Sequence, residues 1–422
     1  MTIALVDANA FYCSAQILFE PWYRDFPVCA ASNNDGAIVS RNDPAKALGI
    51  KMGQPVFELR ELISRNELKV FSSNYALYQS VSNRIMAVLD ELAPKIFIYS
   101  IDECFADLAG VPNPEAWGRH AKDELQRRLG MPMGVGIGPT KTLAKLANWA
   151  AKRWKSQTGC VVDLSDPARQ EKLMRYAPVG EVWGIGRRLS ARLETELNIR
   201  TAWQLATADP KLLRRHFSVN VERTARELTG VVCFPFADSG PERKHQIICS
   251  RSFGEKTFSL EPLQGAVVTF TSTAAAKLRA QGSLANCLQV FARSSAFGSG
   301  VPYSGSRIIA MPYPTDDTRD LAAAALQGLS SIYREGVAFA KAGVILTQFV
   351  ERGSITDDLF APKPRASSKA LMGVMDAINA RQGRGAIRLA RDTAAPAWKM
   401  RQEMLSPAFT TSWQGLPKAS CR

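Results

Sequence analysis

The stretch KIFIYSIDECFADL, residues 95–108, places two adjacent carboxylates, Asp102 and Glu103, between two short apolar runs. Residues 96–101 and 104–108 are rich in β-branched, aromatic and aliphatic side chains, as strands usually are. The two acidic residues between them fit a tight turn. The stretch therefore predicts a β-hairpin with two carboxylates at its tip.

The segments around the hairpin predict one α/β unit. Apolar residues at steps of three and four indicate a helix before the hairpin, started by Ser72 or Ser73, and a second helix after it, ended by Gly130. The expected strands span residues 3–6 and 133–137, and the expected helices span residues 73–92 and 114–129. The order strand, helix, strand, strand, helix, strand is that of the split βαβ fold, whose first and third strands are antiparallel neighbours.

Asp7 follows the first strand and should therefore face Asp102 and Glu103 across the sheet. Three carboxylates at one sheet edge repel one another unless cations neutralise them. Their oxygens suit Mg²⁺, and two such ions could activate a 3′-hydroxyl and stabilise a leaving pyrophosphate. Each acid alone could be an ordinary turn or strand-end residue, but the convergence of all three favours a metal site.

Composition bounds the class of protein. The 422 residues are 46% hydrophobic and 22% charged, which fits a chain of about two to four globular domains. Lys and Arg exceed Asp and Glu by 53 to 39, and the net charge of +14 favours a polyanionic partner. The eight cysteines and three histidines lack zinc-ligand spacing, no stretch reaches the length of a membrane span, and the N-terminus does not read as a signal peptide. We expect a protein of the cytoplasm or nucleoid with no membrane partner.

Residues near the carboxylates indicate a nucleotide site. Tyr12 follows the first strand closely enough to lie under a nucleotide sugar, where its ring would clash with a 2′-hydroxyl. An insertion over residues 32–71 is too long for a plain loop and predicts a small lobe over the site. Arg41 and Lys46 in this lobe are placed to reach phosphates, although a solvated basic surface explains Arg41 about as well.

The sequence GVGIGPTKTLAKLANWAAKR, residues 134–153, predicts a strand, a glycine turn and a helix. Its glycines match neither the dinucleotide fingerprint nor a P-loop. Lys141, Lys145 and Lys152 recur at steps of four and seven and share one helix face. This face could hold a triphosphate or DNA, or could simply be solvated.

Residues 166–230 are helical in pattern, and VWGIGRR within them matches a helix-hairpin-helix. In that motif a tight glycine turn joins two helices, and backbone N–H groups and arginines grip phosphates without reading bases. An ordinary αα-hairpin is the alternative. The expected DNA contacts are Gly184, Gly186, Arg187 and Arg188.

The order strand, helix, strand, strand, helix, strand recurs after a polar linker. This second βαββαβ unit has no acidic triad, and Arg251, Arg293 and Arg307 suggest a sheet that lies on a phosphate backbone. The basic tail that follows is expected to form a short helix at residues 371–379 and to be irregular elsewhere.

With these motifs the chain resembles the Y-family translesion DNA polymerases, and among them the UmuC type. The likeness runs from end to end. It is carried by VDANAFY, SSNYALY, YSIDE, GVGIGPTKTLAKLAN, VWGIGRR and ICSRSFGE. The tail motifs AINARQGRG and MLSPAFTT separate the UmuC type from the shorter polymerase IV type.

The resemblance implies an α+β right-hand polymerase. Its parts would be a ferredoxin-like, split βαβ palm, a small fingers insertion, a helical thumb with the helix-hairpin-helix, and a second βαββαβ little-finger domain. The expected limits are residues 1–31 and 72–165 for the palm, 32–71 for the fingers, 166–237 for the thumb, 244–350 for the little finger and 351–422 for a partner-binding tail.

The resemblance also implies site residues. The expected ligands of two Mg²⁺ ions are Asp7, Asp102, Glu103 and the Ala8 carbonyl. Tyr12 matches the steric gate, Lys46 and Lys152 match positions that hold the triphosphate of the incoming dNTP, and Ser40 would lie on the nucleotide.

Two positions depart from the family pattern. Many members have a tyrosine as a triphosphate contact where this chain has Asp43, so the phosphate grip there must come from elsewhere or be weaker. The clamp-binding peptide of the family normally starts with glutamine, whereas here Thr356 precedes Leu359 and Phe360, which we still expect to dock on the sliding clamp.

Together these inferences predict a DNA-directed DNA polymerase that adds dNTPs opposite damaged template bases with low fidelity, in SOS-type repair and mutagenesis. The expected partners are primer–template DNA, a UmuD-type dimer, a RecA filament and the sliding clamp. A nucleotidyl cyclase could share the palm and the two-metal chemistry, but the hairpin block and the basic second repeat argue against it. A non-catalytic scaffold is the other alternative, and the intact Asp7, Asp102 and Glu103 speak against that one.

Overall fold

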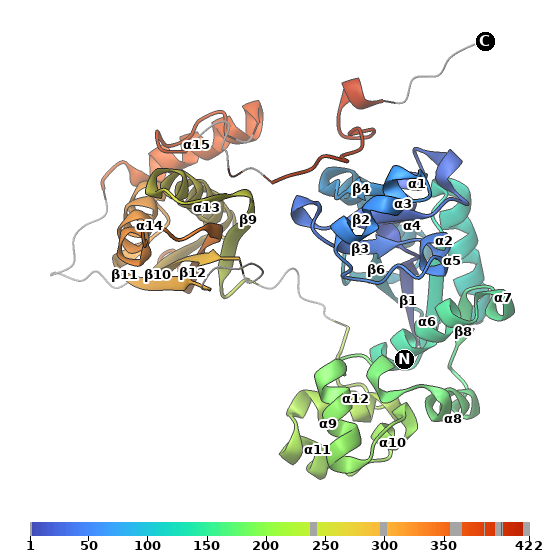
Figure 1. Ribbon diagram of the computed structural model, residues 1–422. Helices are drawn as coiled ribbons and strands as arrows, with labels where there is room; N and C mark the ends of the chain where they lie inside the picture. The colour runs from blue at the N-terminus through green and yellow to red at the C-terminus, as the bar shows by residue number, and fades with distance from the viewer. Residues whose placement is uncertain are drawn as a thin grey trace. The chain divides into compact units, whose positions relative to one another are not determined.

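The computed structural model describes residues 2–236, 243–295, 302–354, 365–383, 385–392, 398 and 400–416. They belong to two compact units, Met1–Gly240 with Met404–Arg422, and Pro241–Glu403. Figure 1 shows the helices and strands of each unit. The last stretch of the chain therefore belongs to the same unit as its beginning.

The first unit is built on a sheet with strand order β5-β6-β1-β7-β8, called the central sheet below. Its strands are β1 (Ile3–Ala8), β5 (Lys95–Ile98), β6 (Glu103–Asp107), β7 (Met133–Gly138) and β8 (Val161–Asp163). β1 is antiparallel to both β6 and β7, so the first and third strands of the repeat are neighbours, as the split βαβ order predicts. The expected fold class is confirmed in this unit.

Strand alternation divides the side chains of β1 between the two faces of the central sheet. The helices that cover these faces are α4 (Tyr75–Leu92), α5 (Pro114–Leu129) and α6 (Lys141–Arg153). Val6 and Ala8 share a core with residues of α4 and α5, whereas Leu5 packs with Ala144 of α6. Asp7 continues the second set, so its carboxylate lies on the face that α6 covers.

The predicted two-residue turn between the strands of the hairpin is wrong. Glu103 is already the first residue of β6. The amides of Tyr99 and Ser100 donate to its carbonyl oxygen at 3.0 and 3.1 Å, so the loop includes residues before the acidic pair. Asp102 lies at the end of this loop, and Glu103 lies on the sheet.

The predicted cap of helix α4 is also wrong. The cap is Asn74, whose side chain accepts a hydrogen bond from the amide of Leu77. Ser73 is engaged elsewhere, because its hydroxyl donates to the carbonyl of Ala31 at 2.6 Å. Asparagine and serine cap helices equally well, so the sequence alone left the choice open.

A second sheet in the first unit, called the small sheet below, has strand order β3-β2-β4 and a core of its own. Its strands are β2 (Val28–Ala31), β3 (Ile38–Arg41) and β4 (Lys69–Ser72), and the lobe includes the helices α2 (Asp43–Ala47) and α3 (Arg60–Ser64). Helix α1 (Phe11–Ile17) connects β1 to this lobe. The small sheet overlaps the expected insertion over residues 32–71, but its strand β2 lies wholly before residue 32.

Helices follow the central sheet, as the sequence pattern predicts. They are α8 (Pro167–Tyr176), α9 (Arg187–Leu197), α10 (Ala202–Ala206), α11 (Pro210–His216) and α12 (Val219–Leu228), whereas the short helix α7 (Lys155–Thr158) comes before β8. The glycine turn of the expected hairpin is preceded by a single 3₁₀ turn, Val179–Glu181, rather than by a full helix. The second helix of the hairpin, α9, begins at Arg187 as expected.

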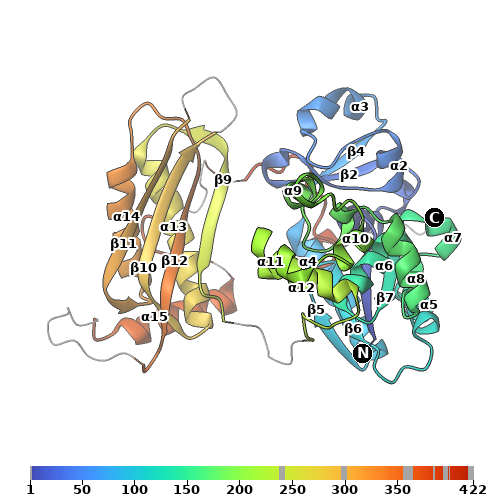
Figure 2. The ribbon, with the colours of Figure 1, turned by 90° about the horizontal axis from the view of Figure 1, so that it is seen from below.

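The second unit has the predicted order of elements but a different strand order from the central sheet. Its elements are β9 (Ile247–Thr257), α13 (Leu260–Ala280), β10 (Ser283–Ser294), β11 (Ser304–Thr315), α14 (Thr318–Ile332) and β12 (Phe339–Glu351). The strands lie in the order β11-β10-β12-β9, so the first strand pairs with the fourth and not with the third (Figure 2). Helices α13 and α14 cover one face of this sheet (Figure 1).

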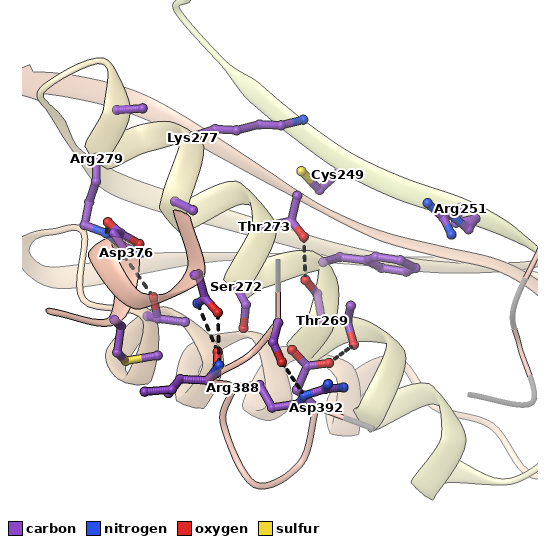
Figure 3. A pocket seen from close by; sticks show the side chains of 18 of the residues that line it. Cys249, Arg251, Thr269, Ser272, Thr273, Lys277, Arg279, Asp376, Arg388 and Asp392 are labelled. Atoms are coloured by element: carbon purple, nitrogen blue, oxygen red, sulfur yellow. Dashed lines mark hydrogen bonds and ion pairs between the residues drawn. The ribbon is translucent and has the colours of Figure 1, made fainter. Parts of the chain in front are cut away.

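The first part of the tail packs on the second unit. Helix α15 (Ser368–Gln382) is longer than predicted, and its Asp376 accepts two hydrogen bonds from Arg279 of α13 at 2.6 and 2.8 Å. Asp392 accepts a hydrogen bond from Thr269 of α13 at 2.6 Å. Together with β9 these segments surround a cavity of about 1140 Å³ (Figure 3).

The end of the tail packs on the first unit. Met404 exchanges two hydrogen bonds with Ser72, and the side-chain amide of Asn74 donates to Ser406 Oγ at 3.0 Å. The ring of Phe409 stacks on Phe19 with centroids 4.7 Å apart. These contacts place part of the motif MLSPAFTT at the start of α4.

In the described part of the chain, no helix is long and apolar enough to cross a bilayer.

Candidate active site

The strand register brings the predicted carboxylates together. Asp7 of β1 lies directly opposite Glu103 of β6, and the amide of Ala8 donates to the carbonyl of Asp102 at 3.0 Å. Asp102 is held by Ser100, whose hydroxyl donates to its Oδ1 at 2.5 Å. The expected proximity of Asp7 to the acidic pair is therefore correct, while Ser100 is a contact that our reading of the sequence missed.

Helix α6 lies very close to the central sheet because glycines of β7 face it. A Cβ built on Gly136 would lie 2.1 Å from the amide nitrogen of Asn148 and 2.2 Å from the carbonyl oxygen of Ala144. The same construction on Gly134 and Gly138 gives nearest distances of 2.9 and 3.0 Å. The pattern GVGIG therefore serves helix–sheet packing. Glycine at every second position of a strand was the signal for it.

Two lysines of α6 are held over the carboxylates. Lys152 Nζ lies 2.5 Å from Oδ1 of Asp7, and Lys145 Nζ lies 3.0 Å from both carboxylate oxygens of Glu103. The Lys145 ammonium also lies over the ring of Tyr99, 4.5 Å from its centroid. The close approach of α6 to the sheet thus places a cation on each of the two paired acids.

Lys141 does not lie over the carboxylates with Lys145 and Lys152, although helical spacing predicts that the three lysines share one face. Its ammonium donates to the carbonyl of Pro235 at 2.8 Å and lies over the ring of Phe97. Burial lowers the pKa of Lys141, against the opposing charge of Glu227. Its role is to join α6 to the segment after α12, and it is not available to a triphosphate.

Asp7 is the most perturbed acid of the site. Burial raises the pKa of Asp7 to about 7, and the charges of Glu103 and Asp102 act in the same direction. Lys152 opposes this rise through its charge and its hydrogen bond. A buried carboxylate next to two others favours the binding of further positive charge.

The acids fit a divalent cation chemically, but they are turned to other partners in the structure. Three carboxylates and a nearby carbonyl are the oxygen donors that Mg²⁺ prefers. In the described part of the chain no three Asp, Glu, His or Cys side chains lie close enough to share one ion. The reason is visible in the contacts: Asp7 points to Lys152, Glu103 to Lys145 and Asp102 to Ser100. Binding of an ion would require these acids to exchange partners.

The predicted steric gate stands in an aromatic cluster beside the acids. The ring of Tyr12 stacks on Tyr78 with centroids 4.3 Å apart and packs edge-on against Tyr75 at 6.4 Å. Gln16 donates to the Tyr78 hydroxyl at 3.0 Å. Burial raises the pKa of the Tyr12 phenol, and the charge of Asp102 contributes to the rise. The ring is therefore fixed in place near the carboxylates.

The predicted nucleotide contacts of the small sheet have other partners. Ser40 is buried, and Arg41 donates to the carbonyl of Ile50 at 2.6 Å. Their contact with a nucleotide stays a prediction, and the structure does not present either side chain as a free phosphate ligand.

Lys46 is paired with the acid that departs from the family pattern. Its ammonium lies 2.7 Å from Asp43, and Asp43 also pairs with Lys155 of α7. These two lysines hold the pKa of Asp43 below its usual range, although burial acts against them. Asp43 thus connects the small lobe to helix α7.

The predicted DNA contacts of the glycine turn are exposed. Gly184 adopts a φ of +84°, which favours glycine, and Gly186 is the cap of α9. Arg187 and Arg188 are solvent-exposed in the first turn of α9. Their binding to DNA stays a prediction.

The three predicted arginines of the second unit do not share one face of its sheet. Paired residues on neighbouring strands lie on the same face. Arg251 and Arg307 each lie opposite a buried core residue, on the face that α13 and α14 cover, and Arg251 lines the cavity beside α13 (Figure 3). Arg293 instead lies opposite Lys341, on the other face. The binding of these arginines to a phosphate backbone stays a prediction.

The predicted clamp contacts Leu359 and Phe360 lie outside the described residues. Their binding to a sliding clamp stays a prediction.

Three family models match the chain. The impB/mucB/samB family matches residues 6–149, and the impB/mucB/samB family C-terminal domain matches residues 244–359. A domain of unknown function, DUF4113, matches residues 369–419. The last match covers α15 and the segment that returns to the first unit.

Relatives match over almost the whole chain. Protein ImpB of Salmonella typhimurium is 44% identical over 99% of this chain and 99% of its own length. Protein UmuC of Salmonella typhimurium is 42% identical over 98% of this chain and 99% of its own length. DNA polymerase IV of Caulobacter vibrioides is more distant, 28% identical over 92% of this chain and 93% of its own length.

A solved structure supports the fold. A Y-family DNA polymerase chimera of Dbh and Dpo4 aligns with a TM-score of 0.64 and 20% identity, over 83% of this chain and 100% of the chimera. At this identity the likeness speaks for the fold alone. The full-length identities decide the family: this chain belongs to the impB/mucB/samB family and is a Y-family polymerase of the UmuC type.

Proposed function

We propose that this chain is an error-prone translesion DNA polymerase that adds dNTPs to a primer 3′-end opposite damaged template bases. The observation that carries the proposal is the pairing of Asp7 with Glu103 at the sheet edge, next to Asp102 and beneath the lysines of α6. In this proposal the central sheet belongs to the palm, the small sheet to the fingers, the helical block to the thumb and the second unit to the little finger.

The chemistry would be two-metal-ion phosphoryl transfer. Asp7, Asp102, Glu103 and the Ala8 carbonyl would hold two Mg²⁺ ions, which when bound activate the primer 3′-hydroxyl and stabilise charge on the leaving pyrophosphate. The side chains of Asp7 and Glu103 would first release the lysines that neutralise them in the structure.

The chain's own residues would position the nucleotide. Lys152, once released from Asp7, can turn its ammonium to the triphosphate, and Lys46 can do so after leaving Asp43. Tyr12, held by its stacking on Tyr78, would exclude a 2′-hydroxyl and so select deoxynucleotides. The small lobe over the site would check the shape of the base pair only loosely.

The UmuC-type membership favours particular partners. We propose primer–template DNA, a UmuD-type dimer, a RecA filament and the sliding clamp, the last through Leu359 and Phe360. The role would be SOS-type repair and mutagenesis at the nucleoid. The glycine turn with Arg187 and Arg188 would grip phosphates without reading bases.

Primer extension past an abasic site tests the proposal. Wild type and Asp102→Ala are compared with Mg²⁺ and dNTPs, with and without a UmuD-type partner and RecA–ATP. We expect wild type to extend past the lesion and Asp102→Ala to lose extension by at least about a thousandfold while still binding DNA.

The reactions with and without partners test the UmuC-type role. Extension that requires the UmuD-type partner and RecA–ATP would support the UmuC-type role. If neither protein extended a primer under any condition while both bound DNA, a non-catalytic scaffold would replace the polymerase.

A further inference from the structure

Helix α6 directs three polar side chains toward the face of the central sheet that carries the acids. Lys145, Asn148 and Lys152 follow one another at steps of three and four, so they share one side of the helix. The two lysines are paired with Glu103 and Asp7. Asn148 lies between these ion pairs along the helix.

Asn148 is buried and unpaired. Its exposed fraction is 2%, and neither Oδ1 nor Nδ2 has a hydrogen-bond partner among the described residues. Most buried amides are hydrogen-bonded, and leaving one without a partner is unfavourable. An exception next to a cluster of acids calls for an explanation, and a partner that reaches the amide only after the neighbouring charged groups rearrange would supply one.

The surroundings of Asn148 identify the group it can reach. A Cβ built on Gly134 would lie 2.9 Å from Oδ1 of Asn148 and 3.4 Å from both Cγ and Cε of Lys152. Gly134 is the strand partner of Asp7, so the amide, the lysine stem and the carboxylate are gathered on one face at one level of the sheet. The amide oxygen of Asn148 therefore lies beside the path of the Lys152 side chain.

The proposed function requires Lys152 to leave Asp7. A buried or half-buried ammonium needs acceptors at each position it occupies. Asn148 precedes Lys152 by four residues, the spacing at which helix side chains meet, and its oxygen is an acceptor without a donor among the described residues.

We propose that Asn148 is a positioning residue for nucleotide binding. Its Oδ1 accepts a hydrogen bond from the Lys152 ammonium after that ammonium has left Asp7, and so orients Lys152 toward the triphosphate of the incoming dNTP. This inference rests on the proposed polymerase function.

The test is the equilibrium affinity for a dNTP on a primer that cannot react. The primer ends in a dideoxynucleotide, the template carries a fluorescent base, and a complementary dNTP is titrated with Mg²⁺. Asn148→Leu keeps the size of the side chain and removes the amide. We expect its Kd for dNTP to rise about fivefold to tenfold, the loss expected of one hydrogen bond to a charged group. We expect its Kd for primer–template to stay unchanged.

Thermal unfolding separates this role from a structural one. Because the amide has no partner in the described structure, Asn148→Leu should unfold at the wild-type temperature or above it. A lower unfolding temperature together with unchanged dNTP affinity would show a structural amide and overturn the proposal. Should leucine not be accommodated, Asn148→Ala is expected to weaken dNTP binding in the same direction, and wild-type dNTP affinity in that variant would overturn the proposal equally.

Thr271→Val is the matched control. Thr271 is buried in α13 of the second unit, where its hydroxyl donates to the carbonyl of Val267 at 2.8 Å. The variant removes a buried polar group far along the chain from α6 and should leave dNTP affinity unchanged. If wild type bound no dNTP on the blocked primer, the proposed function would fall. If wild type and Asn148→Leu bound dNTP equally well, only the role of Asn148 would fall.

Discussion

The central sheet and the sheet of the second unit are built from the same order of elements, yet only one of them gathers acids. In the central sheet the first and third strands are neighbours, which sets Asp7 opposite Glu103. In the second unit the first strand, β9, pairs with the fourth, and the third strand lies at the opposite edge. Strand order, rather than element order, therefore decides which strand ends can form a site.

The helices on the two sheets differ as well. Helix α6 approaches β7 over glycines and brings polar side chains to the sheet, whereas α13 packs on its sheet with an apolar core that includes Leu263, Val267 and Phe270. In the first arrangement, buried lysines and carboxylates lie side by side and can change partners. In the second, apolar packing stabilises the fold. The predictions below test this difference, beginning with the largest expected effect.

Gly136→Ala should remove the close approach on which the site depends. Its Cβ would lie 2.1 Å from the backbone of Asn148 and cannot be accommodated without moving α6. We expect a loss of at least about 3 kcal/mol in unfolding free energy and loss of primer extension. Denaturant unfolding and extension assays measure both.

Gly373→Ala in α15 is the matched change in the second unit. A Cβ there meets nothing within 4 Å, and alanine is the better helix former, so stability should rise by about 0.5–1 kcal/mol. Equal effects of the two substitutions would contradict the account of α6.

The tail offers a second comparison, because it contributes an aromatic residue to each unit. Phe409 is buried against Phe19 in the first unit, and Trp398 is buried against Phe270 in the second. Phe409→Ala and Trp398→Ala should each destabilise their own unit by about 3 kcal/mol. Hydrogen–deuterium exchange resolved by peptide should show lost protection in that unit, and loss confined to the other unit would refute the assignment.

Much of this architecture was predictable from the sequence, and the exceptions have common physical causes. Periodic apolar residues and the split βαβ order predicted that Asp7 meets the acidic pair. They did not show that Lys141 turns away from Lys145 and Lys152, because helical spacing does not reveal what each position of a face meets. They did not separate Arg293 from the other arginines of its sheet either, because register is set by long-range pairing.

The tail was the least predictable region. Met404 contacts Ser72 before α4, and Phe409 contacts Phe19 just after α1. In each pair the two residues are more than three hundred positions apart, so no local sequence pattern predicts the contact. For the site itself, the acids and Tyr12 were recognisable from motifs, whereas Ser100 and Asn148 required the geometry.

Buried aspartates of the two units should respond oppositely to removal of their charge. Burial raises the pKa of Asp7 to about 7, so its folded state holds a proton that the unfolded state releases, and stability falls as pH rises from about 4 to about 7. Asp317 caps α14 and pairs with Arg319 and Ser368, which together bring its pKa down to about 2 against the effect of burial. Its contribution is present above about pH 4 and is lost as pH falls toward 2.

At pH 8, Asp7→Asn should therefore stabilise the first unit by about 1–2 kcal/mol while abolishing extension, and Asp317→Asn should destabilise the second unit by a similar amount. Thermal unfolding from pH 3 to 8 measures both effects. If Asp317→Asn stabilised the protein at pH 8, or if Asp7→Asn destabilised it, the predicted difference between the two aspartates would be refuted.

A further prediction concerns the face of the second sheet that carries Arg293 and Lys341. Replacing both by alanine should weaken primer–template binding about tenfold at 0.1 M salt and lower the salt slope by about 2. Arg251→Ala, on the helix-covered face, should change neither. Fluorescence anisotropy at several salt concentrations measures the affinity for primer–template. If Arg251→Ala weakened binding more than the double variant did, the other face of the sheet would be the one that contacts DNA.

The most direct test of the central claim is a count of divalent ions bound at the central sheet. Mn²⁺ is titrated and followed by electron paramagnetic resonance, with a dideoxy-ended primer–template and a complementary dNTP, for wild type and for Asp7→Asn with Asp102→Asn. We predict two tightly bound ions in wild type and their loss in the double variant, which still binds DNA. Equal numbers of bound ions in both proteins would show that these acids are not the metal ligands.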